Sequence, residues 1–383
     1  MHVVIADTLP PEIVSSLEAL GYRVSANPDL DPSVAVKDAD VLVVARSRVT
    51  RRVIEAGTRL KAILRAGVGV ETIDLVAASE RGVTVAHCPG ADVHARAEHA
   101  LGLVLALDRG LGGGRAGALG LRGRTLGLVG FDGAARALQA AAGALGMRVL
   151  VWDPALTPAL AAEAGVHRAD GLDALFSRAD IVSLHVPESA GVVVTRERLG
   201  KLPAGATLVN VGARGLIDLA ALGDALAAGQ IRVGIDVYDA DDYGDDVPFA
   251  ADAHPGLIAT FRQAGRTHQC DDAVGHAVVR ALEVFLSDRV LPDAANLGAG
   301  AGPGGATGAG HPRLVVRHRN DPGVLPGIFE ALQEQGATIA GVEGRGFEGG
   351  VATLLRIELT LPATPTLIDE VAGLAGVLGV EAY

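Results

Sequence analysis

The sequence predicts an α/β protein with two doubly wound parallel sheets, followed by a small βαββαβ domain at the C-terminal end. Three observations carry this prediction. Short apolar runs alternate with helical patterns over residues 1–286, which is typical of parallel strands joined by right-handed crossovers. A glycine-rich stretch follows at 298–310. After it, the predicted order becomes strand, helix, strand, strand, helix, strand, a ferredoxin-like module.

The first parallel sheet is predicted within residues 1–100. Its elements are the strands Val3–Ala6, Val41–Ala45 and Leu60–Leu64, and the helix Pro11–Leu20. The Ala- and Leu-rich run Glu98–Asp108 predicts a long buried helix.

The second sheet begins at Thr125 and has the Rossmann/flavodoxin-like, doubly wound pattern. A long helix, Asp272–Leu286, closes this series. The expected strands are Leu126–Gly130, Val149–Asp153, Ile181–His185, Thr207–Val211 and Ile231–Val237, and the expected helices are Ala134–Leu145 and Leu172–Phe176.

The C-terminal module comes after a stretch of thirteen residues, 298–310, of which seven are glycine. Such a stretch has no side chains to pack and predicts a flexible linker. The expected elements are the strands Leu314–His318, Thr338–Gly341, Ala352–Leu359 and Val377–Tyr383, and the helices Pro322–Gln335 and Pro365–Ala375.

Composition narrows the class of protein. The 383 residues are 49% hydrophobic with a mean hydropathy of +0.33, yet no apolar run is long enough to predict a membrane span. Cys88 and Cys270 are the only cysteines, which excludes a disulfide framework and a Cys-rich metal site. This scarcity of cysteine indicates a reducing compartment, so we expect a cytoplasmic protein. Met1–Asp7 predicts a strand rather than a signal peptide. A net charge of −12 argues against a nucleic-acid partner.

A candidate nucleotide loop follows the strand Leu126–Gly130. The run Gly130-Phe131-Asp132-Gly133-Ala134-Ala135 leads directly into a helix, whose amino end would face a pyrophosphate. Asp153 follows 23 residues after Gly130, where a carboxylate grips the adenosine ribose and favours NAD over NADP. Gly130, Gly133, Ala135 and Asp153 are therefore the predicted cofactor residues. A strand-turn-helix that binds nothing is the competing interpretation.

Asp132 departs from the glycine-rich pattern. It stands where a second glycine lets the backbone approach the phosphates. Its negative charge would lie near a pyrophosphate, and like charges about 4 Å apart cost roughly 1–4 kcal/mol. The sequence therefore predicts NAD as the cofactor, with affinity lowered by roughly one to three decades. Gly133 could take over the missing role if the turn moved by one residue.

Ordered motifs along the chain resemble those of the D-isomer-specific 2-hydroxyacid dehydrogenases, and of the phosphoglycerate-oxidising members in particular. The resemblance covers nearly the whole chain outside the glycine-rich stretch. The matching segments are Arg65–Asp74, Arg81–Val85, Pro89-Gly90, Ala97–His99, Leu184–Pro187, Asn210-Val211, Asp236–Tyr238 and His318–Leu325.

The resemblance implies an NAD-dependent oxidation of a phosphorylated 2-hydroxyacid in L-serine biosynthesis, carried out by a homo-oligomer. It also implies four segments. Residues 1–100 and 275–297 would form the substrate-binding domain, and residues 101–274 the NAD-binding domain. Residues 298–311 would be the linker, and residues 312–383 an ACT domain that binds an amino-acid effector. His185 and Asp236 fall in family motifs next to the cofactor.

The substrate arginine of the family falls in an N-x-A/S-R-G pattern. In Asn210-Val211-Gly212-Ala213-Arg214-Gly215 that position is Ala213, and Arg214 stands one residue later. A one-residue shift in an extended segment turns the side chain to the opposite face. Arg214 remains the candidate catalytic arginine if the backbone slips locally.

The proton shuttle of the family is a histidine held by a glutamate. The corresponding positions carry Arg262 and Asp241. A guanidinium has a pKa above about 12 and cannot cycle a proton near neutral pH. Arg262 could instead pair with Asp241 or bind an anion. His254 and His268 are the nearest other bases, although each is more simply a surface histidine.

Substrate and effector residues are also implied by the resemblance. Arg46 would bind the substrate phosphate, since arginine suits bidentate phosphate contacts, and Gly67 with Val68 would line the substrate. In the C-terminal module, His318 and Asn320 match the effector pattern, and Thr338 replaces a usual asparagine. Serine is the effector implied. The competing interpretation of 320–323 is a plain turn before a helix.

Two hypotheses follow. The first is an active dehydrogenase whose displaced Arg214 and Asp241 still work. The second is a non-enzymatic homologue that binds an amino acid or nucleotide, or that pairs with a true dehydrogenase and regulates it. Loss of a general acid-base group alone costs about 10²–10⁴ in rate, so impaired or absent activity is favoured. No metal site is predicted.

Overall fold

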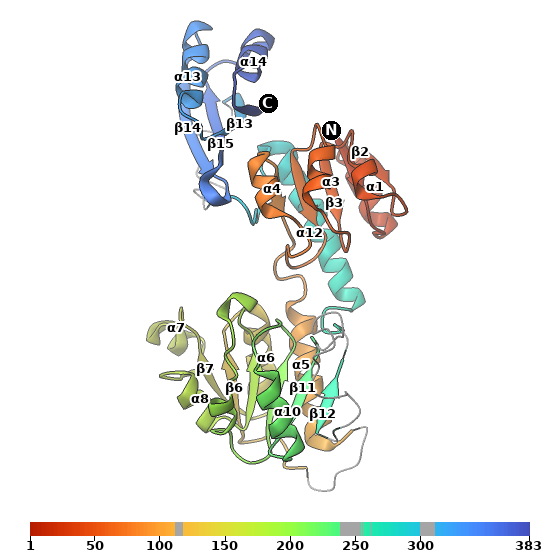
Figure 1. Ribbon diagram of the computed structural model, residues 1–383, viewed down its shortest axis with the longest axis vertical. Helices are drawn as coiled ribbons and strands as arrows, with labels where there is room; N and C mark the ends of the chain where they lie inside the picture. Colours follow the sequence, from red (N-terminus) through yellow and green to blue (C-terminus); the bar gives the residue numbers. More distant parts are fainter. Residues whose placement is uncertain (112–117, 238–253, 255, 261, 299–310) are drawn as a thin grey trace. The chain divides into compact units, whose positions relative to one another are not determined.

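The structure, a computed structural model, describes residues 1–111, 118–237, 254, 256–260, 262–298 and 311–383. The chain forms two compact units (Figure 1). Unit 1 combines Met1–Ala91 with Asp272–Tyr383, and unit 2 is Asp92–Asp271.

Unit 1 contains a five-stranded parallel sheet in the order β2-β1-β3-β4-β5. This is the doubly wound order of flavodoxin-like folds, with its switch point between β1 and β3. Helices α1 and α12 cover one face, and α3 and α4 cover the other. The strands are β1 (His2–Ile5), β2 (Arg23–Ala26), β3 (Val41–Val44), β4 (Ala62–Arg65) and β5 (Thr84–Ala86). The helices are α1 (Pro11–Ala19), α2 (Pro32–Ala35), α3 (Arg51–Ala56), α4 (Leu75–Glu80) and α12 (His268–Asp288).

Unit 2 contains a seven-stranded parallel sheet in the order β12-β11-β10-β9-β6-β7-β8. The order reverses between β6 and β9, as in dinucleotide-binding sheets. Helices α5 and α6 pack on one face, and α8 and α10 on the other. The strands are β6 (Thr125–Val129), β7 (Arg148–Trp152), β8 (His167–Arg168), β9 (Ile181–Leu184), β10 (Ala206–Asn210), β11 (Ile231–Ile235) and β12 (Leu257–Ala259). The helices are α5 (Val93–Arg109), α6 (Gly133–Ala144), α7 (Pro158–Glu163), α8 (Leu172–Arg178), α9 (Arg196–Leu199) and α10 (Leu219–Ala227), and a 3₁₀ turn, η1, spans Glu188–Ala190.

The predicted two parallel sheets are confirmed. The unit boundary, Ala91/Asp92, falls before the 100/101 division that the sequence suggested. The physical reason is the packing of α5. Ala97, Ala100 and Leu103 of this helix all belong to the core that packs on the seven-stranded sheet, so the whole helix belongs to unit 2.

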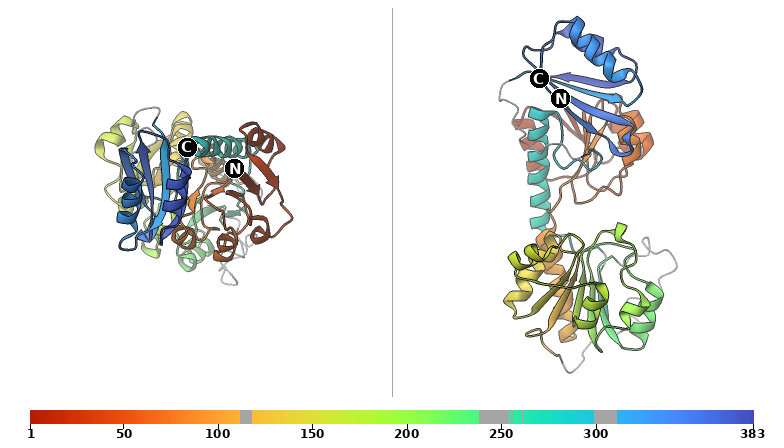
Figure 2. Two further views of the ribbon diagram at one scale, coloured as in Figure 1. Left: turned by 90° about the horizontal axis from the view of Figure 1, so that it is seen from above. Right: turned by 90° about the vertical axis from the view of Figure 1, so that its left-hand side faces the viewer.

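The C-terminal part of unit 1 is an antiparallel sheet in the order β14-β15-β13-β16, and α13 and α14 bury its one face. The right-hand view of Figure 2 shows a helix lying along this sheet. The predicted βαββαβ order is present; its identity as an ACT domain stays a prediction. Most of the linker prediction, 299–310, lies outside the described residues. The elements are β13 (Arg313–Arg319), α13 (Val324–Glu334), β14 (Ile339–Gly346), η3 (Glu348–Gly350), β15 (Ala352–Leu359), α14 (Pro365–Ala372) and β16 (Val377–Ala382).

Two element boundaries differ from those predicted from the sequence. The helix predicted from Pro322 begins at Val324, because Gly323 adopts a left-handed φ of 92° and closes a turn first. The strand expected to end at Gly341 continues to Gly346. Its glycines lower strand propensity, but pairing with β15 along the full length overrides that preference.

Asn296, in the segment after α12, ties the edge strand β5 to the C-terminal sheet. Its side chain accepts from the Val85 N–H (2.8 Å) and donates to the Val83 carbonyl (2.9 Å). Its own carbonyl accepts from the N–H of Glu348 (2.9 Å). An apolar cluster that includes Leu297 and Phe347 lies beside these bonds. The free edge of β5 is thereby covered rather than exposed.

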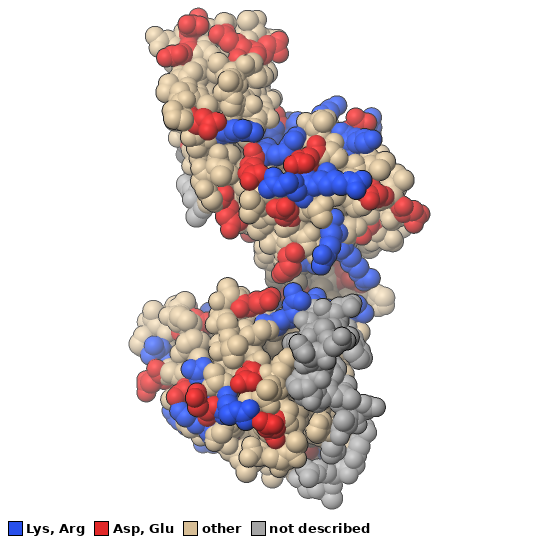
Figure 3. Space-filling model, viewed as in Figure 1, with Lys and Arg blue, Asp and Glu red and all other residues tan. Residues whose placement is uncertain are grey.

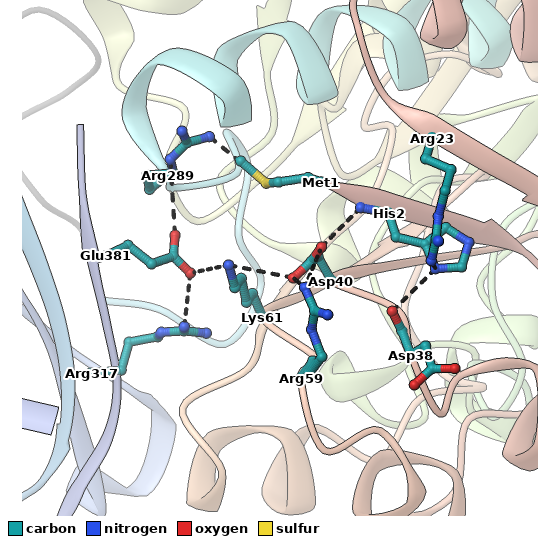
Figure 4. Close-up of polar contacts among 10 residues, drawn as sticks. All are labelled: Met1, His2, Arg23, Asp38, Asp40, Arg59, Lys61, Arg289, Arg317 and Glu381. Atoms are coloured by element: carbon teal, nitrogen blue, oxygen red, sulfur yellow. Dashed lines mark hydrogen bonds and ion pairs between the residues drawn. The ribbon is translucent and has the colours of Figure 1, made fainter. Parts of the chain in front are cut away.

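A chain of charges completes this contact (Figure 4). Glu381 of β16 lies 2.9 Å from Lys61 and 3.0 Å from Arg317, and Lys61 lies 3.4 Å from Asp40. Arg289 of the loop after α12 lies 4.0 Å from the second oxygen of Glu381. Burial lowers the pKa of Arg317, although the charges of Glu381 and Asp40 oppose this. Glu381 is therefore the group that compensates a buried guanidinium.

We predict that Glu381→Gln loosens β13 and β16. The variant leaves the buried guanidinium of Arg317 without its counter-charge, which costs about 1–3 kcal/mol. Amide hydrogen exchange in both strands should accelerate at neutral pH. Glu80→Gln is the matched control, because its pair with Arg51 is solvent-exposed and contributes at most about 1 kcal/mol. Equal exchange in wild type and Glu381→Gln would contradict this role.

Candidate active site

The turn after β6 is held on both sides by glycine. Gly130 has a φ of 93°, and a Cβ there would lie 2.6 Å from the carbonyl oxygen of His185. Gly133 is the first residue of α6, and a Cβ there would lie 2.8 Å from Cγ2 of Val93. Neither position tolerates a larger side chain without movement. The turn has not shifted by one residue, because Gly133 already belongs to the helix.

Asp132, between these glycines, is the N-cap of α6. Its Oδ1 accepts from the N–H of Ala135 (2.8 Å). Its Oδ2 lies 3.3 Å from Nη1 of Arg96, which projects from α5. Nδ1 of His185 lies 3.5 Å from Oδ1. The predicted residues Gly130, Ala135 and His185 are thus brought together, around a carboxylate.

The protonation states of this group follow from burial and charge. Burial acts to raise the pKa of Asp132, but the His185 imidazole, the Ala135 N–H and the Arg96 guanidinium outweigh it and lower that pKa. Burial lowers the pKa of His185, despite the nearby carboxylate. Asp132 is therefore ionised and His185 neutral at pH 7. Ser183 Oγ lies 2.9 Å from Nε2 of His185 and orients the ring.

Asp153 stands directly after β7, as predicted, beside the same turn. Its Oδ2 accepts from the N–H of Phe131 (2.9 Å), and its Oδ1 accepts from the N–H of Ala155 (2.7 Å). The carboxylate is thus fixed at the carboxyl edge of the sheet. Its position fits a contact to the ribose of a dinucleotide.

Asp236, after β11, organises the segment that follows β12. Its carboxylate accepts from the N–H groups of Gln263 (2.7 Å) and Ala264 (2.9 Å), and from the hydroxyl of Thr260. His99 of α5 lies 2.9 Å from the same hydroxyl. Burial acts to raise the pKa of Asp236, and these contacts together lower it. Asp236 was predicted to contact the cofactor; in the structure its carboxylate contacts the loop and His99, whose Nε2 lies 3.3 Å away.

Arg262 lies in this loop with a left-handed φ of 51°. Its N–H donates to the carbonyl of Asp236 (2.7 Å). Such a conformation costs an L-residue roughly 1–2 kcal/mol, which the hydrogen bonds around Asp236 offset. Arg262 as a whole is an exposed residue. Asp241, its predicted partner, lies outside the described residues.

The loop after β10 places the two candidate arginine positions differently. Ala213 is partly buried and packs against the core of unit 2. Arg214 is half-exposed, with Nε 4.0 Å from Oε1 of Glu188. Gly215 has a φ of 67°, so the backbone turns immediately after Arg214. The side chain of Asn210 accepts from the N–H of Gly212 (3.2 Å), which fixes the start of the loop.

The predicted substrate residues lie at the carboxyl ends of β3 and β4 in unit 1. Asp7 accepts from three consecutive N–H groups, those of Ala45, Arg46 and Ser47, at 2.6 to 3.1 Å. Burial opposes ionisation of Asp7, but these donors lower its pKa. The side chain of Arg46 is left exposed. Gly67 and Val68, after β4, are half-buried.

The predicted effector residues divide into two groups. His318 on β13 is 3% exposed, and its Nε2 has no hydrogen-bond partner among the described residues. Asn320 accepts from Thr353 Oγ1 (2.8 Å) and donates to the carbonyl of Gly350 (2.8 Å). Thr338 precedes the end of β14 that pairs with Leu359, whereas His318 pairs with Thr353. At about 3.3 Å per residue, roughly 20 Å of strand separates them within one chain.

Two further observations concern the whole set of described residues. No cluster of three or more His, Cys, Asp and Glu side chains within it could hold a metal ion. None of its helices combines the length and apolarity needed to cross a bilayer. On the face drawn in Figure 3, basic and acidic side chains are interspersed over unit 1.

Comparisons with known proteins agree on one family. Residues 112–260 match the sequence model described as D-isomer specific 2-hydroxyacid dehydrogenase, NAD binding domain. The hydroxypyruvate reductase of Thermotoga maritima is 34% identical over 263 residues, covering 64% of this chain and 85% of that protein. The chain belongs to the D-isomer-specific 2-hydroxyacid dehydrogenase family. Unit 2 contains the NAD-binding domain of this family.

Other relatives extend the match. D-3-phosphoglycerate dehydrogenase of Mycobacterium tuberculosis is 34% identical over 317 residues, covering 78% of this chain. The chain spans 59% of the length of that relative. A Thermus thermophilus structure has a TM-score of 0.67 at 29% identity, covering 77% of this chain and all of the other. The NAD⁺-bound 3-phosphoglycerate dehydrogenase of Entamoeba histolytica shares the fold, with a TM-score of 0.67 at 23% identity, covering 77% and 98% of the two chains.

The residues of the NAD-binding domain fit a dinucleotide only in part. Gly130, Asp153 and the amino end of α6 lie where the fold requires them. Asp132 does not fit, because its carboxylate already takes the N–H of Ala135 that an anion would use. The capping role was readable from an Asp directly before a helix. Arg96 carried no sequence signal, since only the packed fold brings α5 to this turn.

We predict that Asp236 contributes stability only while it is ionised. Its pKa in the folded protein is lowered from 3.8, so the contribution is present above about pH 4 and is lost as pH falls through the folded pKa. Urea unfolding followed by the fluorescence of Trp152, the one tryptophan, should show Asp236→Asn destabilised at pH 7 and less so at pH 3.

Asp224→Asn is the control for this experiment. Asp224 pairs with Arg196 on the surface, with both side chains more than 60% exposed, and should contribute little at either pH. A destabilisation by Asp236→Asn that is the same at pH 3 and pH 7 would overturn the assignment.

Proposed function

We propose that this chain is a phosphoglycerate-dehydrogenase-like homologue in L-serine biosynthesis whose dehydrogenase activity is impaired or lost. The observation that carries the proposal is Arg262, which stands where family members place the proton-shuttling histidine. A guanidinium stays protonated near neutral pH and cannot act as the base. Family membership and the name of the mycobacterial relative support the substrate class, a phosphorylated 2-hydroxyacid.

A second departure supports the same proposal. Ala213 stands at the position of the arginine that binds the substrate carboxylate, and it packs against the apolar core. Arg214 is displaced by one residue and lies nearest Glu188 among the acidic groups described around it. Loss of a carboxylate clamp adds to the loss of the base, because the two act on different parts of the substrate.

The assignments of individual site residues, domain limits, location and assembly are also part of this proposal. Arg46 would bind the substrate phosphate, with Gly67 and Val68 beside it, and Arg214, Asp241 and Arg262 would remain at the reaction centre. The substrate-binding and NAD-binding domains would divide near residue 100, and the protein would work as a cytoplasmic homo-oligomer. No nucleic-acid partner is proposed.

A second candidate function is regulation by the C-terminal module, proposed as an ACT domain that binds an amino acid such as serine. The buried Nε2 of His318, which has no hydrogen-bond partner in the described part of the chain, favours it, because a ligand that bonded this nitrogen would remove the cost of leaving it unsatisfied. Asn320 lies two residues away, and Thr338 would have to come from another copy of the chain.

We expect turnover with NAD and D-3-phosphoglycerate to lie well below the ordinary range of about 1–10³ s⁻¹. The double variant Arg262→His with Ala213→Arg restores both groups and should raise turnover by at least about 10²-fold. Arg266→His, an exposed position four residues on, is the control and should change nothing. Wild-type turnover within the ordinary range would refute the loss of activity.

Calorimetry with L-serine tests the second function. If the C-terminal module binds serine, His318→Ala should abolish the heat of binding, while His311→Ala, an exposed residue before β13, should leave it unchanged. Identical heats in wild type and His318→Ala would remove His318 from the site.

A further inference from the structure

The NAD-binding domain holds an anion of its own at the position where a dinucleotide places its pyrophosphate. Three nitrogen atoms surround the carboxylate of Asp132. The N–H of Ala135 (2.8 Å) and Nη1 of Arg96 (3.3 Å) donate to it, and Nδ1 of His185 faces it at 3.5 Å without a hydrogen bond. These are a helix amino end, a guanidinium and an imidazole, the groups that proteins use to bind phosphate. We propose that Asp132 is an internal anion that competes with pyrophosphate for these donors.

The buried side chain of His185 is a second feature of the site occupied by the Asp132 carboxylate. Its side chain is fully buried and its Nδ1 faces Asp132 at a distance too long for a good hydrogen bond. Ser183 holds the other ring nitrogen. The ring of His185 therefore faces the Asp132 carboxylate, and it cannot turn away without breaking its hydrogen bond to Ser183.

Arg96 reaches the same point from a different helix. Its Nη2 lies 3.2 Å from where a Cβ on Gly212 would stand, so the guanidinium spans from α6 to the loop after β10. Its Nε lies 3.9 Å from Asp92. The side chain is 20% exposed and that of Asp132 is 36% exposed. The two side chains thus neutralise each other at the amino end of α6.

The Asp132 carboxylate cannot leave this position without losing contacts. The turn runs close to its neighbours, since a Cβ on Gly130 would lie 2.6 Å from the carbonyl oxygen of His185 and a Cβ on Gly133 would lie 2.8 Å from Cγ2 of Val93. Rotation of the Asp132 side chain away from the turn breaks the cap of α6 and the pair with Arg96. A dinucleotide therefore binds against both the repulsion of the charge and the loss of these contacts.

The proposal concerns binding by the NAD-binding domain and stands apart from the loss of turnover. It also limits the ligand class: a phosphate-free nucleoside meets no competition from Asp132, whereas a nucleotide meets more as its phosphate charge grows. A comparison of the affinities for adenosine and NADH therefore distinguishes charge competition at Asp132 from a general change in the domain.

The test is titration calorimetry of the full chain with NADH and with adenosine. Asp132→Gly removes charge and bulk, and Asp132→Asn removes the charge while keeping size and helix-capping ability. We expect both variants to gain about 10- to 1,000-fold in NADH affinity. Adenosine affinity should change less than threefold. Asp224→Asn, which removes one surface charge of the same unit, should affect neither ligand.

Several outcomes would overturn the proposal. One is tight NADH binding by wild type that neither variant improves. Another is weak NADH binding that stays equally weak in both variants. A third is a gain for adenosine as large as that for NADH, because a phosphate-free ligand does not compete for these donors. If Asp132→Gly fails to fold, the result with Asp132→Asn decides, since its cap is retained.

Discussion

The capping of α6 by Asp132 is the interaction on which the character of the NAD-binding domain depends. One carboxylate satisfies the orphan N–H of a helix, orders Arg96 and faces the buried ring of His185. The hydrogen bond from Ala135 and the ion pair with Arg96 stabilise the turn. The same contacts use up what a cofactor phosphate would bind, so stability of this turn and affinity for a dinucleotide oppose each other.

At the positions proposed to carry the reaction, the backbone scaffold is likewise kept independently of the side chains that would do the chemistry. Asp236 holds the loop after β12 through two N–H groups and the Thr260 hydroxyl, with His99 behind them. The loop therefore keeps its form with Arg262 at the position proposed for the shuttle histidine. Ala213 likewise joins the core and needs no partner. Function resides in the side chains rather than the fold, so a complete scaffold is compatible with lost chemistry.

Sequence patterns predicted both parallel sheets and the C-terminal βαββαβ order, because apolar periodicity and glycine-rich turns report local structure directly. Short edge elements such as β8, with two exposed residues, carry no such signal. Asp132 could be located by motif, but its partners could not, because Arg96 and His185 approach from elements 36 and 53 residues away in sequence. Thr353, which binds Asn320, became visible only through the strand register.

Energy transfer from Trp152 to NADH is the most direct test of the occupied anion position. Trp152 is the single tryptophan, and its carbonyl accepts from the N–H of Gly130 in the turn itself, so a bound nicotinamide cofactor lies within reach of its emission. An internal anion at Asp132 predicts that transfer in the wild-type chain saturates at an NADH concentration about 10- to 1,000-fold higher than in Asp132→Asn. Saturation of both chains at the same NADH concentration would contradict it.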